Sequence, residues 1–264
     1  MGLSVTLGLM GFINLAHGVF AMAGGYLAAL AVSAYGVPWP ATLILAPLVI
    51  AAAAIPLERV LFARLYGRSE LDQVLFCIGL IFVAGALIRL GFGPTMRTMP
   101  VPGMLRQNLP FAGTAFPAYK LLVIAVGAAV AGALLLALER TRAGAMIRAA
   151  VENRGMAESV GLRTSSIFTA TFALGGALGA LGGILGADLF PLTPSYGFDV
   201  LVFIQIVVAV AGLGTLRGSF IASLLVGLIL TVSAYFLPEL GTVALFVTVF
   251  LILLLRPRGL FGRV

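Results

Sequence analysis

The sequence predicts an all-α fold, a polytopic membrane bundle of about eight spans that includes discontinuous helices. Of its 264 residues, 61% are hydrophobic and only 9% are charged, and the mean hydropathy is +1.17. A soluble domain carries roughly 25% charged residues, so this composition does not suit a surface that faces water. Apolar runs near the roughly 20 residues that cross a bilayer recur along the chain. We expect residues 1–264 to form a single transmembrane domain.

Charged residues, prolines and glycines divide the chain into apolar segments. We expect these at 2–13, 18–35, 41–62, 74–92, 119–138, 166–186, 199–212, 219–236 and 241–255. The first segment is too short to cross a bilayer by itself at about 1.5 Å per residue. It is therefore either half of a broken helix or the remainder of a truncated N-terminal helix.

The break between the first two segments carries the most information. The stretch GFINLAHG places Asn14 and His17 beside glycines in an otherwise apolar region. A polar side chain in hydrocarbon is costly unless it is satisfied, and broken helices occur where they face protein or a water-filled path. The pattern therefore indicates a transporter or channel. Asn14 and His17 either line the translocation path or cap the broken helix ends, and Gln205 either joins that path or bonds a neighbouring helix.

The basic residues are unevenly divided between two sets of connections. The richer set, with twelve of the sixteen lysines and arginines, comprises 58–73, 139–165, 213–218 and 256–264. The other set comprises 36–40, 89–120, 187–198 and 237–240. Alternating spans place each set on one side of the membrane, and the positive-inside rule makes the richer set cytoplasmic. The C-terminus is then also expected in the cytoplasm.

Two further segments have a recognisable pattern. Gly175, Gly179 and Gly183 recur every four residues and predict a groove for close helix packing, either within one subunit or in a dimer. The connection 139–165 is long, rich in helix formers and mixed in charge. It predicts one or two short amphipathic helices whose small residues suit a protein partner that grips a short helix.

The sequence gives no sign of catalysis. It has one histidine and one cysteine, Cys77, so neither a nucleophile triad nor a metal cluster is expected, and no cofactor is expected either. We therefore do not expect an enzyme. The formal net charge is +7. The basic residues that produce it lie between the apolar runs and have no aromatic residues interleaved with them, which indicates membrane topology rather than nucleic-acid binding.

Four stretches together resemble a known family. GFINLAHGVFAMAGGY, RAGAMIRAAVENRGMAESVGL, AVAGLGTLRGSFIASLLVGL and RPRGLFG occur in this order, and they resemble the H-type (LIV-type) permeases of branched-chain amino-acid ABC importers. Family members carry about one more helix upstream, so the resemblance implies a truncated N-terminal helix. The resemblance also implies that a coupling helix contacts an ATPase, through Gly144, Arg148, Ala149, Asn153, Ala157 and Gly161.

The resemblance implies a function and partners. It implies an importer subunit in the bacterial inner membrane, surrounded by lipid, that carries branched-chain or related amino acids by alternating access. The implied partners are a second homologous permease, two cytoplasmic ATPases that hydrolyse ATP and a periplasmic substrate-binding protein. A permease for urea or short-chain amides, and an ion-coupled secondary transporter acting alone, are the alternatives. An ion-coupled transporter needs acids within the membrane, whereas the acids here lie at span ends.

Overall fold

The computed structural model describes residues 2–4, 6, 14–111, 114–212, 215–236 and 238–262. The long helices are α2 (His17–Tyr35), α3 (Trp39–Val60), α4 (Glu70–Phe92), α5 (Ala118–Arg140), α8 (Thr164–Gly186), α9 (Tyr196–Ala211), α10 (Leu216–Phe236) and α11 (Gly241–Leu255). The shorter elements are η1 (Phe62–Arg64), η2 (Gly103–Arg106), β1 (Asn108–Phe111), β2 (Thr114–Pro117), α6 (Arg142–Glu152) and α7 (Arg154–Ser159). These elements confirm the predicted helical membrane bundle.

The described helices agree with the expected spans to within a few residues. Six of them are long and apolar enough to cross a membrane, and α9 and α11 are shorter apolar helices. The largest difference is at α4, which begins at Glu70 rather than at 74. Its N-cap is Ser69, whose hydroxyl accepts a hydrogen bond from the amide of Asp72 at 3.2 Å. A serine cap followed by acids in the first turn stabilises a helix start, so the helix extends beyond its apolar part.

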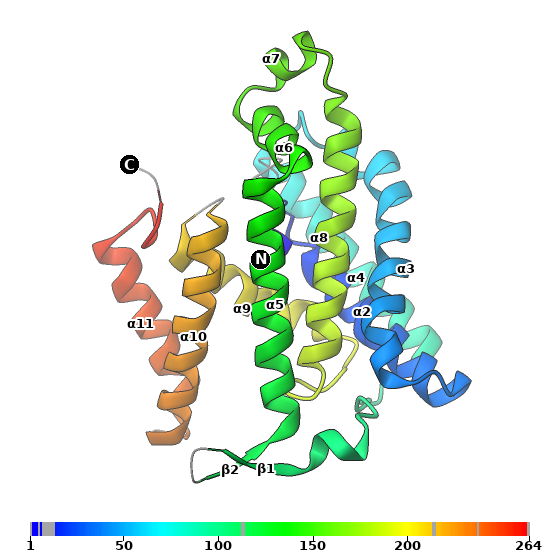
Figure 1. Ribbon diagram of the computed structural model, residues 1–264, viewed down its shortest axis with the longest axis vertical. Coiled ribbons are helices and arrows are strands. Elements are labelled where there is room, and N and C mark those ends of the chain that lie inside the picture. The colour runs from blue at the N-terminus through cyan, green and yellow to red at the C-terminus, as the bar shows by residue number, and fades with distance from the viewer. Residues whose placement is uncertain are drawn as a thin grey trace.

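Helices α2 and α8 form the centre of the bundle. Figure 1 shows α8 between α5 and α3, with α2 behind it, and α10 and α11 as a pair at the other side. The residues of α2 and α8 are the most buried among the candidate spans. Phe172 of α8 packs on Phe20 of α2 and on Phe62, with ring centroids 5.6 Å and 4.7 Å apart. These aromatic contacts join α8, α2 and the end of α3 into one core.

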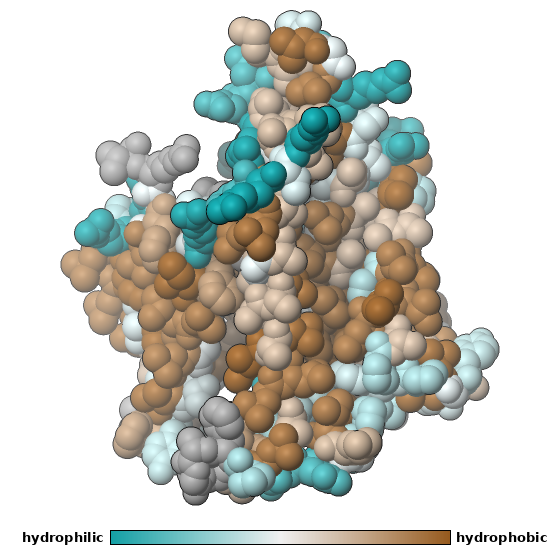
Figure 2. All heavy atoms as spheres, in the orientation of Figure 1, coloured by the Kyte–Doolittle hydropathy of each residue, from teal (hydrophilic) through white to brown (hydrophobic). Residues whose placement is uncertain are grey.

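The two ends of the bundle differ. Helices α6 and α7 project from one end, and the β1–β2 hairpin lies at the opposite end (Figure 1). Figure 2 shows hydrophilic residues gathered over the α6–α7 end and a broad apolar belt below them. Large apolar side chains are exposed along the long helices, among them Leu48 of α3, Phe82 and Leu87 of α4, Leu224 of α10 and Phe250 of α11. Lipid is the environment that such a surface fits.

One connection contains a short strand pairing that the sequence did not predict. The connection 89–120 contains a short antiparallel hairpin in which Asn108 pairs with Pro117 and Leu109 with Phe116. The same connection is tied to the loop after α8, because the backbones of Arg97 and Leu192 form an antiparallel bridge. Alternating patterns this short give little signal in a sequence, and the bridge joins residues far apart in the chain.

Candidate functional site

The segment predicted to contact an ATPase forms two short capped helices. The hydroxyl of Thr141 accepts a hydrogen bond from the amide of Gly144 at 3.0 Å and caps α6. The side chain of Asn153 accepts one from the amide of Met156 at 2.9 Å and caps α7. Gly161 follows α7 with φ of 85°, a conformation that favours glycine. Two of the residues assigned to coupling, Asn153 and Gly161, therefore define where α7 begins and where the chain turns after it.

The other residues assigned to coupling divide into buried and exposed positions. Gly144 is buried, and a Cβ atom there would overlap the carbonyl oxygen of Leu138, so α6 lies directly against the end of α5. Ala157 is also buried, whereas Arg148 and Ala149 are exposed. The buried pair holds the helices to the bundle, and the exposed pair is available to a partner.

Exposed apolar side chains lie close in sequence to Arg148 and Ala149 on the same two helices. Met146, Val151, Met156 and Val160 are exposed on α6, on α7 and just after α7. They lie among the exposed charges of Arg148 and other polar residues at the hydrophilic end of the molecule (Figure 2). We call the exposed residues Met146, Arg148, Ala149, Val151, Met156 and Val160 the α6–α7 surface. Its mixture of apolar and charged groups is typical of protein interfaces.

The cap at Asn153 leads to a testable prediction. We expect Asn153→Ala to raise amide hydrogen exchange in α7, because loss of an N-cap costs about 1 kcal/mol. Asn153→Asp keeps an acceptor at the same place and should leave exchange close to that of the unchanged protein. Hydrogen-exchange mass spectrometry of the purified protein measures both. Equal exchange for all three proteins would contradict a capping role.

The polar break before α2 is buried. The side chains of Asn14 and His17 are only 1% and 3% exposed. Both polar atoms of Asn14, and Nδ1 of His17, have no hydrogen-bond partner among the described residues. Helix α2 has Ala16 as its N-cap and no side-chain cap, so Asn14 does not cap α2. Instead, Leu15 and Ala16 pack in the same apolar cluster as Cys77 of α4. Residues 7–13, which precede the break, lie outside the described residues.

The glycines of α8 lie against the start of α2 and the N-terminal segment. A Cβ atom at Gly175 would lie 2.6 Å from the methyl group of Thr6, and one at Gly179 would lie 3.2 Å from Nε2 of His17. A Cβ atom at Gly183 would overlap the carbonyl oxygen of Ala21. The three glycines therefore line a contact within this chain, where α8 meets the polar break.

Helix α9 also touches this region, but through its first turn. A Cβ atom at Gly18 would overlap the carbonyl oxygen of Gly197, and the hydroxyl of Tyr196 donates to the carbonyl of Gly183 at 3.1 Å. Gln205 is half-buried on α9, about 12 Å further along the helix axis from Gly197 at 1.5 Å per residue. The structure therefore places Asn14 and His17 together and Gln205 apart from them.

Two buried polar residues were missed by sequence reasoning. Thr171 on α8 is 1% exposed and its hydroxyl has no partner among the described residues. Glu58 near the end of α3 is 3% exposed and accepts hydrogen bonds from Tyr66 and Thr169. The sequence places Glu58 at a span end beside Arg59, which is typical of an exposed acid. Only the packing of α8 against α3 buries it.

The motif RPRGLFG at the C-terminus has a structural role. The amides of Leu260 and Phe261 donate to the carbonyls of Val210 and Ala211 at 2.8 Å and 3.0 Å. These contacts hold the tail against the end of α9, next to the positive φ of Gly212. The nearby start of α10 is joined to α5 by an ion pair between Arg217 and Glu139, with 2.6 Å between nitrogen and oxygen.

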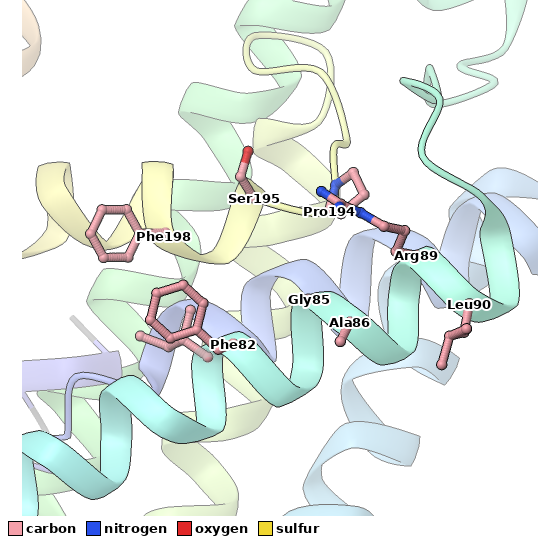
Figure 3. Close-up of a pocket in the computed structure, with 9 residues that line it drawn as sticks. Phe82, Gly85, Ala86, Arg89, Leu90, Pro194, Ser195 and Phe198 are labelled. Atoms are coloured by element: carbon pink, nitrogen blue, oxygen red, sulfur yellow. The ribbon is translucent and has the colours of Figure 1, made fainter.

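At the hairpin end, a cavity of about 660 Å³ lies between α4 and the start of α9. Figure 3 shows Phe82 and Phe198 on one side of it and Arg89 extending toward Pro194 on the other. Apart from Arg89 and Ser195 its lining is apolar. A Cβ atom at Gly85 would lie 2.9 Å from the carbonyl oxygen of Pro194, so α4 and this loop are in close contact beside the cavity.

Comparison with known proteins agrees with this architecture. A family model described as the permease component of the branched-chain amino acid transport system matches residues 1–255. The chain is 28% identical over 279 residues to the high-affinity branched-chain amino acid transport system permease protein BraD of Pseudomonas aeruginosa. It is 27% identical over 281 residues to the permease protein LivH of Salmonella typhimurium, and 26% identical to LivH of Escherichia coli K12. Each alignment covers 100% of this chain and 90% of the relative.

No solved structure matches the chain. The family assignment therefore comes from the sequence comparisons, and the helical bundle with its long apolar spans is consistent with it. The matched region includes every described helix, from α2 to the end of α11. The resemblance inferred from the four sequence stretches is confirmed. The chain belongs to the family of branched-chain amino acid transport permeases, as a multi-pass membrane protein.

Proposed function

We propose that this chain is the permease subunit of an ATP-driven importer that carries branched-chain or related amino acids inward by alternating access. The single observation that supports coupling to a partner is the α6–α7 surface. It lies at one end of the bundle, on two capped helices that are packed against α5 and α8. A rigid element with exposed small and apolar groups is suited to sit in a groove of another protein. The cargo class follows from the names of the relatives.

The contacts of α8 provide a route from that surface to the polar break. The hydroxyl of Thr164, the first residue of α8, donates to Glu158 of α7. Further along α8, Gly179 and Gly183 lie against α2 so closely that an added Cβ atom would be crowded at Gly179 and would overlap backbone at Gly183. Because a close-packed interior has low compressibility and transmits strain, a displacement of α7 would be passed on to α8 and α2. This movement would act where Asn14 and His17 are buried.

Several polar atoms at the break have no partner among the described residues, and they support a role in the translocation path. Buried polar groups are normally hydrogen-bonded, and those without a protein partner are places where water or ligand is bound. We propose that Asn14 and His17, and also Thr171 on α8, gain such partners when the path opens. Gln205 would act at a different depth of the same path, because it lies further along α9.

The proposed complex has several partners. A second homologous permease would complete the path, two ATPases would bind the α6–α7 surfaces, and a periplasmic binding protein would deliver the cargo. The excess of basic residues in the connections of the α6–α7 end supports a cytoplasmic location for that end and for the C-terminus, at the bacterial inner membrane. Lipid would cover the exposed apolar belt, and no nucleic acid or cofactor is proposed.

Reconstitution tests this function. In proteoliposomes that contain the full complex, we expect leucine uptake to require ATP on the side that carries α6 and α7.

An ion-coupled secondary transporter is the second candidate, because Glu58 is an acid buried at a span end. That candidate requires uptake by the purified chain alone, driven by a Na⁺ or proton gradient and independent of ATP. Uptake of this kind would refute the ATP-driven proposal, and preferential uptake of urea or acetamide would refute the cargo class.

The connection between α4 and α5 offers a docking surface for the binding protein. Its two arginines differ, because Arg97 donates to the carbonyl of Phe92 at 3.2 Å and lies over that ring, whereas Arg106 is exposed. We expect Arg106→Glu to weaken docking about tenfold at low salt, and to do so much less at high salt, because exposed charges are screened. Surface plasmon resonance at several salt concentrations measures this. Docking that is independent of salt in the unchanged protein would contradict an electrostatic role.

A further inference from the structure

A cavity of about 530 Å³ lies at the α6–α7 end of the bundle, between the end of α3 and the start of α8. Its volume is within the range of about 300–1,000 Å³ that is typical of small-molecule sites. Unlike the apolar cavity of Figure 3, it is lined by groups of both charge signs and by several hydroxyls. The polar lining residues are Glu58, Arg59, Tyr66, Ser165, Ser166 and Thr169.

The negative group of this cavity is a buried carboxylate. The hydroxyl of Tyr66 donates to Oε1 of Glu58 at 2.6 Å, and that of Thr169 donates to Oε2 at 2.7 Å. Both donors are neutral, and no ion pair within the described residues includes Glu58. A carboxylate has about four acceptor positions, so each oxygen can still accept a hydrogen bond. Because a buried charge without an opposite charge is costly, this geometry favours a cation in the cavity.

Arg59 supplies the positive group of this cavity. Arg59 lines it and is exposed, and Ser165 and Ser166 contribute the first turn of α8. Helix α8 has 23 residues, and its N-cap residue Arg163 makes no side-chain cap. The hydroxyl of Thr164, its first residue, donates to Glu158. The amides at a helix start attract an anion, and the two serine hydroxyls can donate as well. An anionic group would therefore be stabilised a short distance from Glu58.

We propose that this cavity binds a free α-amino acid. The ammonium group would bind Glu58, the carboxylate would bind Arg59 and the start of α8, and the side chain would lie along the apolar lining residues Ala63 and Phe168. The identity of the ligand rests on the proposed function. The cavity lies at the end that carries α6 and α7, so it would hold amino acid on the side to which cargo is delivered. Because the ligand would touch both α3 and α8, its binding would favour the arrangement of these helices that forms the cavity.

The test measures binding to the purified full chain in lipid nanodiscs, with tritiated L-leucine as the probe. We expect Glu58→Gln to weaken leucine binding by about tenfold or more, because it removes a charge-assisted hydrogen bond. Glu70→Gln is the matched control, since Glu70 is an exposed acid that does not line the cavity. Thermal unfolding of each variant shows whether the change affects folding. Unchanged leucine binding by a folded Glu58→Gln protein would overturn the proposal.

A second measurement needs no variant. Two competitors each lack one charged group of leucine: 4-methylpentanoate has no ammonium group, and 3-methylbutylamine has no carboxylate. We expect both to displace leucine at least about tenfold more weakly than leucine itself, because each loses one of two charged contacts. If 3-methylbutylamine competes as well as leucine, the cavity binds cations only and the proposal fails. Neither assay needs ATP or partner proteins, so failed uptake in proteoliposomes would refute the proposed function without changing this result.

Discussion

Substituting arginine for Ala149 is expected to abolish ATP-driven leucine uptake while the protein still inserts into the membrane. Ala149 is exposed on α6, so a larger side chain at this position has room in the isolated chain. A long, charged side chain there would keep α6 out of a partner's groove, and a misplaced or unpaired charge at an interface costs several kcal/mol. Uptake in proteoliposomes containing the full complex measures the effect, together with ATP hydrolysis in response to loaded binding protein.

Two further variants separate loss of docking from loss of folding. Ala149→Ser adds one hydroxyl at the same exposed position and should keep most of the uptake. Ala157→Arg should also abolish uptake, but Ala157 is only 3% exposed, so the arginine would disturb the packing of α7 as well. Ala149→Arg is therefore the clearer experiment. Normal uptake by the Ala149→Arg protein would show that α6 is not the element that binds an ATPase.

The second large effect is expected at Gly183, where a single methyl group should destabilise the bundle. A Cβ atom there would overlap the carbonyl oxygen of Ala21, so Gly183→Ala would force α2 and α8 apart. Overpacking in a core costs about 1–3 kcal/mol, and a clash with backbone is harder to relieve than one with a flexible side chain. We expect the midpoint of thermal unfolding to fall by about 5 °C or more, together with a loss of uptake.

The neighbouring residue provides the control. A Cβ atom at Gly182 would meet nothing within 4 Å, although the two glycines are adjacent on the same helix. We expect Gly182→Ala to leave the unfolding midpoint unchanged or slightly raised, because alanine favours helix over glycine by about 1 kcal/mol. Fluorescence-detected size exclusion after heating measures both variants in detergent. Equal midpoints for the two variants would mean that α2 and α8 are not in close contact at Gly183.

The spans were predictable because their signal is local. Long apolar runs and the residues that bound them determine where α3, α5 and α10 lie, whatever their neighbours are. The start of α4 was less predictable, since the Ser69 cap extends the helix through a polar turn. The hairpin between Asn108 and Pro117 was missed because a pairing of four residues has almost no periodicity to detect.

The candidate sites were only partly predictable. The length and composition of 139–165 indicate short helices, and the two caps at Thr141 and Asn153 agree with that. The sequence could not show that Ala157 is buried while Ala149 is exposed, because this depends on how α7 meets α8. It also suggested that Asn14 could cap a helix, whereas its side chain has no partner among the described residues.

By itself the sequence determined that the chain is a multi-span membrane protein and which family it resembles. It also showed which connections are rich in basic residues and are therefore expected on the same side of the membrane. Composition and span length settle these questions because the bilayer acts on each segment separately. Only the tertiary structure decided that Gly183 lies against Ala21, and that Glu58 lies beside a polar cavity. It also decided that the side chain of Asn14 and Nδ1 of His17 are buried with no hydrogen-bond partner among the described residues. Burial and close approach depend on which helices become neighbours, and residues far apart in the chain determine that together.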